Sequence, residues 1–293
     1  MTASSPAVVI TAQTPSTLGE GSAWWSSIHR LVTVDIAEGR IKYFDPTNDD
    51  ERVEDIGGKL SAVIPRRSGG KVVAVGHELR AYDGNGEPDT SWQVEADIPL
   101  NRFNDCRSDR VGRIWAGTMS TERVPDQAAL YRLDPDGTLT RELAPTTLSN
   151  GLGWSVHGNQ MYFIDSTTYR VDVFDYDESA GHLSNRRIFA QIAPDDGLPD
   201  GLTVDRDGGV WVALFGGGAV RRYSRDGELT HHIPLPVTNP TCPAFGGESL
   251  DTLFVTSARI KLNSAQLRAE PAGALLAIPH LGFQGFSANE CAV

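Results

Sequence analysis

The stretch "GGVWVAL" (residues 208–214) decides the fold, because the chain repeats its pattern of a turn followed by a short apolar strand. Five other segments share this pattern: "RLVTVDI" (30–36), "GKVVAVG" (70–76), "GRIWAGT" (112–118), "NQMYFID" (159–165) and "DTLFVTS" (251–257). The equivalent apolar positions are separated by 41, 42, 47, 49 and 43 residues; they are Leu31, Val72, Ile114, Met161, Val210 and Leu253. Each copy is followed by a second strand-like segment, such as "RIKYFDP" (40–46).

A period of about 40–50 residues, built from strands and Gly/Asp turns, is typical of a β-propeller with about four strands per blade. The sequence therefore predicts an all-β protein, a six-bladed β-propeller of antiparallel sheets, in which residues 1–293 form a single domain. We interpret the six apolar runs as the inner strands of the blades, packed on both faces. An open array of β-sandwiches is the alternative, but sandwiches do not usually repeat so evenly.

A closed ring of blades must also join its two ends. The segment "AVVITAQ" (7–13) is predicted to be a strand that completes the last blade beside the C-terminal segment. This pairing would remove two exposed sheet edges at once.

Composition narrows the classes of partner. The 293 residues carry a formal net charge of −12, which repels phosphate backbones, so we expect no nucleic acid partner. We also expect no membrane association, since there is no basic amphipathic stretch and no apolar run near the ~20 residues of a membrane span. No obligate protein partner is evident from the sequence. The start "MTASSPAVVITAQ" lacks the features of a secretory signal. Cys106, Cys242 and Cys291 are widely spaced, which indicates free thiols in a cytoplasmic protein.

Four polar residues stand before the apolar runs of their blades at a matched distance. With the number of residues to the equivalent apolar position, they are Glu20 (11), Asn104 (10), Asn150 (11) and Asp200 (10). Equivalent positions in equivalent blades lie at the same height around the axis, so these side chains should point at one shared volume. Asn-Gly and Asp-Gly pairs also form turns, which is the alternative interpretation of Asn150 and Asp200.

Two carboxylates and two amides facing one volume make a poor apolar core. Without a cation, Glu20 and Asp200 would repel each other and lose hydration. Oxygen ligands suit one hard divalent cation, Ca²⁺ as the first choice, with Mg²⁺, Mn²⁺ or Zn²⁺ as alternatives. The absence of His from the set weakens the case for a dedicated zinc site.

Several motifs in a fixed order carry a resemblance to a known family. They are "LGEG" (18–21), "NRFND" (101–105), "AGTM" (116–119), "SNGLGWS" (149–155), "LPDG" (198–201) and "LFVTSAR" (253–259). From Glu20 to about Arg259 the chain resembles the regucalcin (senescence marker protein)/gluconolactonase family. The resemblance implies a six-bladed propeller with one divalent metal in its channel, and hydrolysis of sugar lactones.

Site residues follow from the resemblance position by position. It implies metal ligands at Glu20, Asn150 and Asp200, and it implies substrate contacts at Arg102, Asn104 and Glu122. Two positions depart from the family: Cys106 stands where Gly or Ala is frequent, and Gly153 stands where Asp is frequent. Neither departure touches an expected ligand, but Cys106 is placed to line the pocket.

These residues predict a mechanism. The cation acts as a Lewis acid toward the lactone carbonyl, and Asp200 accepts a proton from the attacking water, so that an aldonolactone becomes an aldonic acid. Arg102, Asn104 and Glu122 hydrogen-bond the sugar hydroxyls. Two alternatives stay open: a metal-dependent esterase or organophosphate hydrolase, and a non-catalytic calcium-binding propeller.

Overall fold

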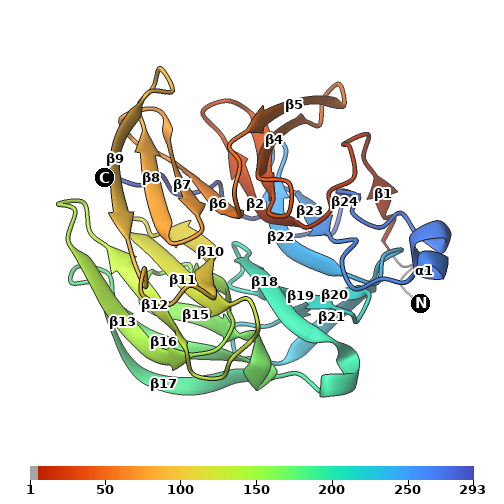
Figure 1. Ribbon diagram of the computed structural model, residues 1–293. Helices are drawn as coiled ribbons and strands as arrows, with labels where there is room; N and C mark the ends of the chain where they lie inside the picture. The colour runs from red at the N-terminus through yellow and green to blue at the C-terminus, as the bar shows by residue number, and fades with distance from the viewer. Residues whose placement is uncertain (1–5) are drawn as a thin grey trace.

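The computed structural model describes residues 6–293 and contains six four-stranded antiparallel sheets arranged around one axis (Figure 1). The predicted six-bladed β-propeller is therefore confirmed. The innermost strands are β2 (Gly19–Trp25), β6 (Leu60–Pro65), β10 (Asn101–Ser108), β14 (Ser149–Trp154), β18 (Leu198–Val204) and β22 (Pro240–Gly246). The second strands are β3 (Arg30–Asp35), β7 (Lys71–Val75), β11 (Ile114–Ser120), β15 (Gln160–Asp165), β19 (Val210–Phe215) and β23 (Thr252–Ser257).

The outer half of each blade follows the same order. The third strands are β4 (Arg40–Asp45), β8 (Glu78–Tyr82), β12 (Ala128–Leu133), β16 (Arg170–Asp177), β20 (Ala219–Tyr223) and β24 (Leu276–Ile278). The outermost strands are β5 (Asp50–Asp55), β9 (Pro88–Gln93), β13 (Leu139–Thr146), β17 (His182–Gln191), β21 (Leu229–Pro234) and β1 (Val9–Ile10). Within residues 6–293, helical structure is limited to α1 (Ser264–Ala269) and the 3-10 turns η1 (Ser166–Thr168) and η2 (Pro194–Asp196).

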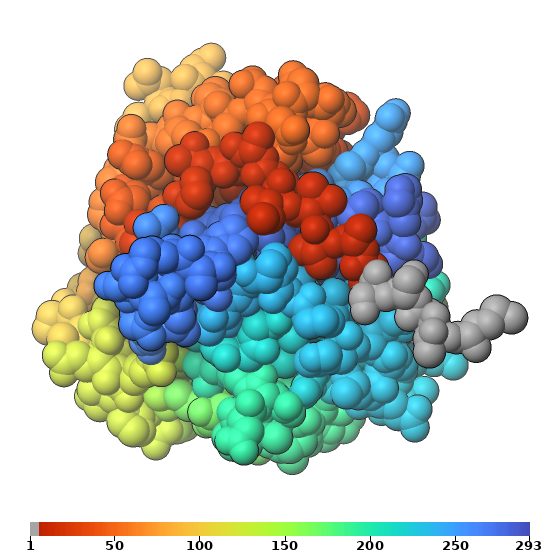
Figure 2. All heavy atoms as spheres, turned by 90° about the vertical axis from the view of Figure 1, so that its right-hand side faces the viewer, coloured from red at the N-terminus to blue at the C-terminus, as the bar shows by residue number. Residues whose placement is uncertain are grey.

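The ring closes between the sixth and the first blade. Innermost strands contact one another in cyclic order, and β22 returns to β2. Thr241 Oγ1 donates to the Gly19 carbonyl at 2.6 Å, and Ser22 Oγ donates to the Cys242 carbonyl at 2.7 Å. The predicted N-terminal strand is confirmed in shortened form, because β1 pairs with β24 over two residues. Figure 2 shows these N-terminal residues in red beside the blue C-terminal segments.

One prediction about the blades is wrong. The six apolar runs form the second strands, and the innermost strands are the segments before them, where the candidate polar residues lie. Second strands such as β11 are buried along their whole length because neighbouring blades cover both of their faces. The innermost strands are also largely buried, but their inward side chains face the channel and can be polar.

The direction of the strands gives the channel two different ends. All innermost strands begin at one end, which we call the upper end, and the turns between second and third strands lie there too. Residues 284–292 cross the lower end, where the backbone N–H groups of Ala288, Cys291 and Ala292 bond to three different blades at 2.8–2.9 Å. The three cysteines are free and buried, as predicted.

Between residues 6 and 293, no helix combines the length and the apolar character that a membrane crossing requires.

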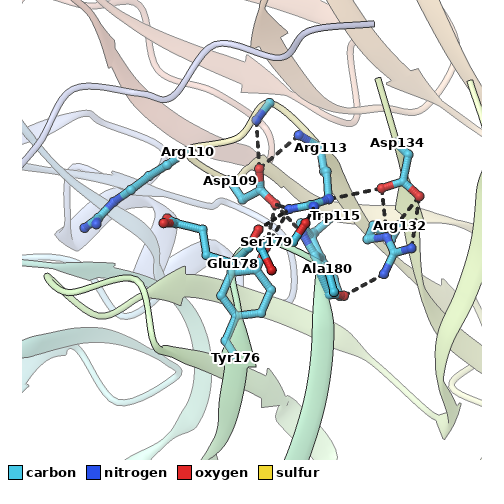
Figure 3. A network of polar contacts seen from close by, with 12 residues as sticks. Asp109, Arg110, Arg113, Trp115, Arg132, Asp134, Tyr176, Glu178, Ser179 and Ala180 are labelled. Carbon is cyan, nitrogen blue, oxygen red and sulfur yellow. Dashed lines mark hydrogen bonds and ion pairs between the residues drawn. The ribbon is translucent and has the colours of Figure 1, made fainter. Parts of the chain in front are cut away.

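A buried carboxylate ties the third blade to the fourth at the lower end (Figure 3). Asp109 accepts hydrogen bonds from the Arg113 backbone N–H at 2.9 Å, from Trp115 Nε1 at 3.2 Å and from the Tyr176 hydroxyl at 2.6 Å. The Arg113 guanidinium contacts the same carboxylate at 3.3 Å and donates to the Ser179 carbonyl at 2.6 Å. Asp109 is fully buried, so no water is at hand to accept these hydrogen bonds if the carboxylate is removed.

We expect Asp109→Ala to destabilise the fold by about 3–5 kcal/mol, because it leaves the buried Trp115 and Tyr176 donors without their acceptor and removes one of the two carboxylates that pair with the Arg113 guanidinium. Urea unfolding followed by tryptophan fluorescence measures this loss. The control is Asp136→Ala in an exposed hairpin turn, where the carboxylate bonds only the Thr138 backbone N–H and a much smaller loss is expected. Equal losses in both variants would contradict the assignment.

Candidate active site

Asn104, Asn150 and Asp200 lie in β-bulges of innermost strands, and Glu20 lies at the edge of another. The register between the innermost and second strands shifts between Glu20 and Ala23, Phe103 and Cys106, Ser149 and Leu152, and Pro199 and Leu202. The other two blades have shifts at the same level, between Leu60 and Ala62 and between Pro240 and Pro243. A bulge bends the strand and redirects a side chain, so six bulges at one height surround the upper channel with side chains.

Glycine follows three of the candidate residues, and after Asn150 and Asp200 the reason is steric. A Cβ on Gly151 would lie 2.5 Å from the Leu202 backbone nitrogen, and a Cβ on Gly201 would lie 2.8 Å from Cys242 Cα. No real Cβ atom approaches backbone that closely, so neighbouring bulges can contact only without a side chain there. The Asn-Gly and Asp-Gly pairs are therefore positions of close strand approach.

A hydrogen-bond chain fixes the amides. Arg102 Nη1 donates to Asn104 Oδ1 at 2.9 Å, and Asn104 Nδ2 donates to Asn150 Oδ1 at 3.2 Å. Asn150 Nδ2 donates to Ser166 Oγ at 2.9 Å, and that hydroxyl donates to the Pro199 carbonyl at 2.6 Å. The chain runs through the third, fourth and fifth blades, so it fixes their relative heights at the site.

The carboxyl groups of the site repel one another. Burial raises the pKa of Glu20 well above its usual range, and the charges of Asp200 and Asp105 raise it further, against the Gly21 N–H and Arg102. Burial also raises the pKa of Asp200 well above its usual range, with a contribution from Asp105 and against Arg123 and the Asn150 amide. Glu20 and Asp200, which the sequence predicts to face one volume, are therefore close enough for their charges to interact.

Arg102 lies beside these carboxyl groups. Burial lowers its pKa to about 10, against the charge of Glu20, so the guanidinium stays positive at neutral pH. Arg107 is a second buried guanidinium, which interacts with the charges of Asp105 and Glu20. Two buried positive charges therefore face three buried carboxyl groups, so the site is short of positive charge.

The donor set fits a hard divalent cation. Glu20 and Asp200 offer carboxylate oxygens and Asn150 offers an amide oxygen, all three held by the bulges on strands of different blades. No three His, Cys, Asp or Glu side chains come together as a metal cluster in residues 6–293, and the set contains only two such side chains besides the amide. The carboxyl groups of Glu20 and Asp200 repel each other and have too little positive charge beside them. This shortage of positive charge is the observation that supports a cation there.

Glu122 lies apart from the other candidate residues. It is exposed on the turn after β11 (Ile114–Ser120), at the upper end. No hydrogen bond or ion pair in the described part of the chain joins it to Arg102 or Asn104. Its contact with substrate stays a prediction.

Asp105 is a site residue that the sequence reasoning left without a role. It is buried, its Oδ2 has no hydrogen-bond partner among residues 6–293, and its charge acts on both Glu20 and Asp200. The signal was the doublet "ND", which puts a second polar side chain in the bulge of β10 where the other site bulges have glycine. Asp105 also lines a cavity of about 390 Å³ that occupies the lower channel, and Cys106 lines it as well.

Comparison with known proteins agrees with this geometry. A family model, the SMP-30/Gluconolactonase/LRE-like region, matches residues 18–259. The chain belongs to this family. Regucalcin of Danio rerio is 35% identical over 272 residues, covering 92% of each chain, and human regucalcin is 34% identical over 277 residues, covering 92% of this chain and 93% of its own.

Two solved structures of the family superimpose closely. A luciferin-regenerating enzyme has a TM-score of 0.92 at 30% identity, covering 98% of this chain and all of its own. A regucalcin from Agrobacterium tumefaciens, described as a calcium-binding protein, has a TM-score of 0.91 at 26% identity and covers 98% of each chain. A gluconolactonase from Xanthomonas campestris, at 23% identity and a TM-score of 0.75, shares the fold.

The raised pKa values predict how stability depends on pH. Between the unfolded-state pKa of about 4 and the raised folded-state pKa, the folded protein binds more protons than the unfolded chain. Its free energy of unfolding therefore falls as the pH rises through that window. We expect Asp200→Asn, treated with chelator, to be more stable than the wild type at pH 8 by about 1 kcal/mol or more, and to lose this advantage at pH 4.

Urea unfolding at pH 4, 6 and 8 measures the effect, and added Ca²⁺ should reverse the order at pH 8. The control is Asp226→Asn, whose side chain is 79% exposed and should show no such crossover. If the chelator-treated wild type is more stable than Asp200→Asn at pH 8, the inferred shortage of positive charge at the site is wrong.

Proposed function

We propose that the protein is a divalent-metal-dependent hydrolase that opens sugar lactones to aldonic acids, with Ca²⁺ as the expected ion. The observation that carries the proposal is the pair of buried carboxyl groups, Glu20 and Asp200, which repel each other around an amide oxygen of Asn150. Membership of a family that contains gluconolactonases supports the substrate class. We also assign the protein to the cytoplasm, which its three free cysteines support.

A cation held by Glu20, Asn150 and Asp200 would supply positive charge for the lactone carbonyl oxygen and keep both carboxyl groups ionised. Asp200 accepts a proton from the water whose oxygen attacks the carbonyl carbon. The C–O bond to the ring oxygen then breaks, and that oxygen takes the proton from Asp200. Water and lactone together become one hydroxy acid, and the side chain returns to its starting state.

Arg102 and Asn104 orient the sugar ring. Their side chains are joined at 2.9 Å, and Asn104 is held by the Ser149 carbonyl at 2.9 Å, so little motion is lost when substrate binds. Glu122 is proposed to accept from another hydroxyl, from its place on the exposed turn after β11 at the upper end.

We expect Asp200→Ala to abolish lactone opening, with a loss of at least 10³-fold in kcat, because both the proton acceptor and a cation ligand are removed. Acid release from a panel of sugar lactones measures it, using metal-free protein supplemented in turn with Ca²⁺, Zn²⁺, Mg²⁺ and Mn²⁺. Asp226→Ala is the matched control with unchanged activity. Wild-type turnover in the Asp200 variant, or full activity in chelator, would refute the proposal.

Arg102→Ala separates the enzyme from a non-catalytic calcium-binding propeller. We expect it to lower kcat/KM for lactones by about tenfold or more, since a charge-assisted hydrogen bond to substrate is worth about 1.5–3 kcal/mol. Calcium affinity, measured by calorimetry, should change much less. Activity against phosphotriesters under the same ion tests the esterase alternative, and a preference for phosphotriesters would favour it.

A further inference from the structure

A second pocket opens at the upper end of the propeller, beside the candidate active site. This rim pocket has a volume of about 300 Å³, and its lining includes Arg123, Tyr169, Asp195, Leu198, Phe215 and Lys261. Leu198 begins β18 two residues before Asp200. Arg123 is close enough for its charge to lower the pKa of Asp200. The rim pocket is therefore a neighbour of the reacting centre.

Two unpaired cations lie in the rim pocket. Arg123 follows β11, and Lys261 follows β23, with its Nζ 5.9 Å from the centre of the Phe215 ring. Burial and the charge of Arg123 lower the pKa of Lys261, so the two positive groups are neighbours. Neither forms an ion pair with any residue from 6 to 293, and that includes Asp195, the one carboxylate in the lining.

Backbone strain is concentrated in the same place. Ten non-glycine residues of the described chain have positive φ angles. Three of them line the rim pocket: Arg123 at 56°, Tyr169 at 52° and Lys261 at 62°. Left-handed backbone is strained for residues other than glycine, and such strain gathers at functional sites where the surrounding structure holds it.

We propose that the rim pocket binds an anionic group of the substrate, a carboxylate or a phosphate, so that Arg123 and Lys261 select acidic sugar lactones over neutral ones. The positive charges of Arg123 and Lys261 repel each other until an anion binds between them. They are also unusual in a chain whose net charge is −12. The apolar wall of Phe215 and Leu198 lowers the local dielectric and strengthens that attraction. This inference rests on the proposed lactonase function.

The test compares kcat/KM for three lactones with the Ca²⁺-loaded protein: glucono-1,5-lactone, its 6-phosphate, and a lactone of glucaric acid. We expect the wild type to prefer an acidic lactone. Comparing the 6-phosphate with the glucaric acid lactone shows whether the rim pocket binds a phosphate or a carboxylate. Arg123→Ala and Lys261→Ala should each lower the ratio of acidic to neutral kcat/KM by about tenfold, and the double variant should lower it further. Raised salt should reduce the same ratio.

Arg225→Ala is the matched control. Its side chain is 78% exposed in the turn after β20 at the lower end, so it removes one positive charge far from the site. The proposal is overturned if the double variant keeps the wild-type ratio, if Arg225→Ala lowers it equally, or if the wild type prefers the neutral lactone.

A second readout keeps this inference separate from the enzymatic one. If no lactone is opened, the proposed function fails, and calorimetry with 6-phosphogluconate and glucarate then decides the rim pocket. Binding that is lost in the Arg123/Lys261 double variant but kept in Arg225→Ala supports the anion site. Binding that is absent, or equal in all three proteins, overturns it.

Discussion

The close approach of six innermost strands around one axis is the constraint on which the rest of the structure depends. Gly151 and Gly201 have no room for a Cβ because neighbouring bulges touch there, and the register shifts stand at one height in every blade. Charged groups from distant parts of the sequence are thereby forced into one buried volume. Folding alone cannot relieve their repulsion, so the ring carries an electrostatic cost that a bound cation would remove.

Much of the fold and of the site could be predicted from the sequence, because the sequence shows both the length of the repeat and the position of each polar residue within it. Matched separations of 10 and 11 residues brought Glu20, Asn104, Asn150 and Asp200 to one height, and the bulges explain why that worked. The identity of the innermost strand was wrong, because blades stacked on both sides bury the first and second strands alike and hydrophobicity does not rank them. Burial and charge depend on neighbours from other blades, so the role of Asp105 needed coordinates.

Charge at the upper end falls into two parts. Glu20, Asp105 and Asp200 are the acidic groups and lie inside the channel, where burial raises their pKa values. Arg123 and Lys261 are positive and lie at the rim. A lactone with an acidic substituent would fit both parts: its carbonyl would point toward a cation in the channel, and its anionic group would point toward Arg123 and Lys261 at the rim. Because the whole chain is acidic, positive charge at this one rim also guides such a molecule toward the channel.

The blades without carboxylates or amides explain why the ion would be open on one side. Thr241 of the sixth blade uses its hydroxyl on the Gly19 carbonyl and Thr256, and Ser61 of the second blade donates to the Ala74 carbonyl at 3.4 Å. Both hydroxyls serve strand pairing, so the proposed ligands come from the first, fourth and fifth blades only. The side facing the second and third blades would then be left for water and substrate, and Arg102 of the third blade lies on that side. A ring with six ligating blades would enclose its cation and bind it without chemistry, whereas three ligating blades would leave coordination positions free for a reaction.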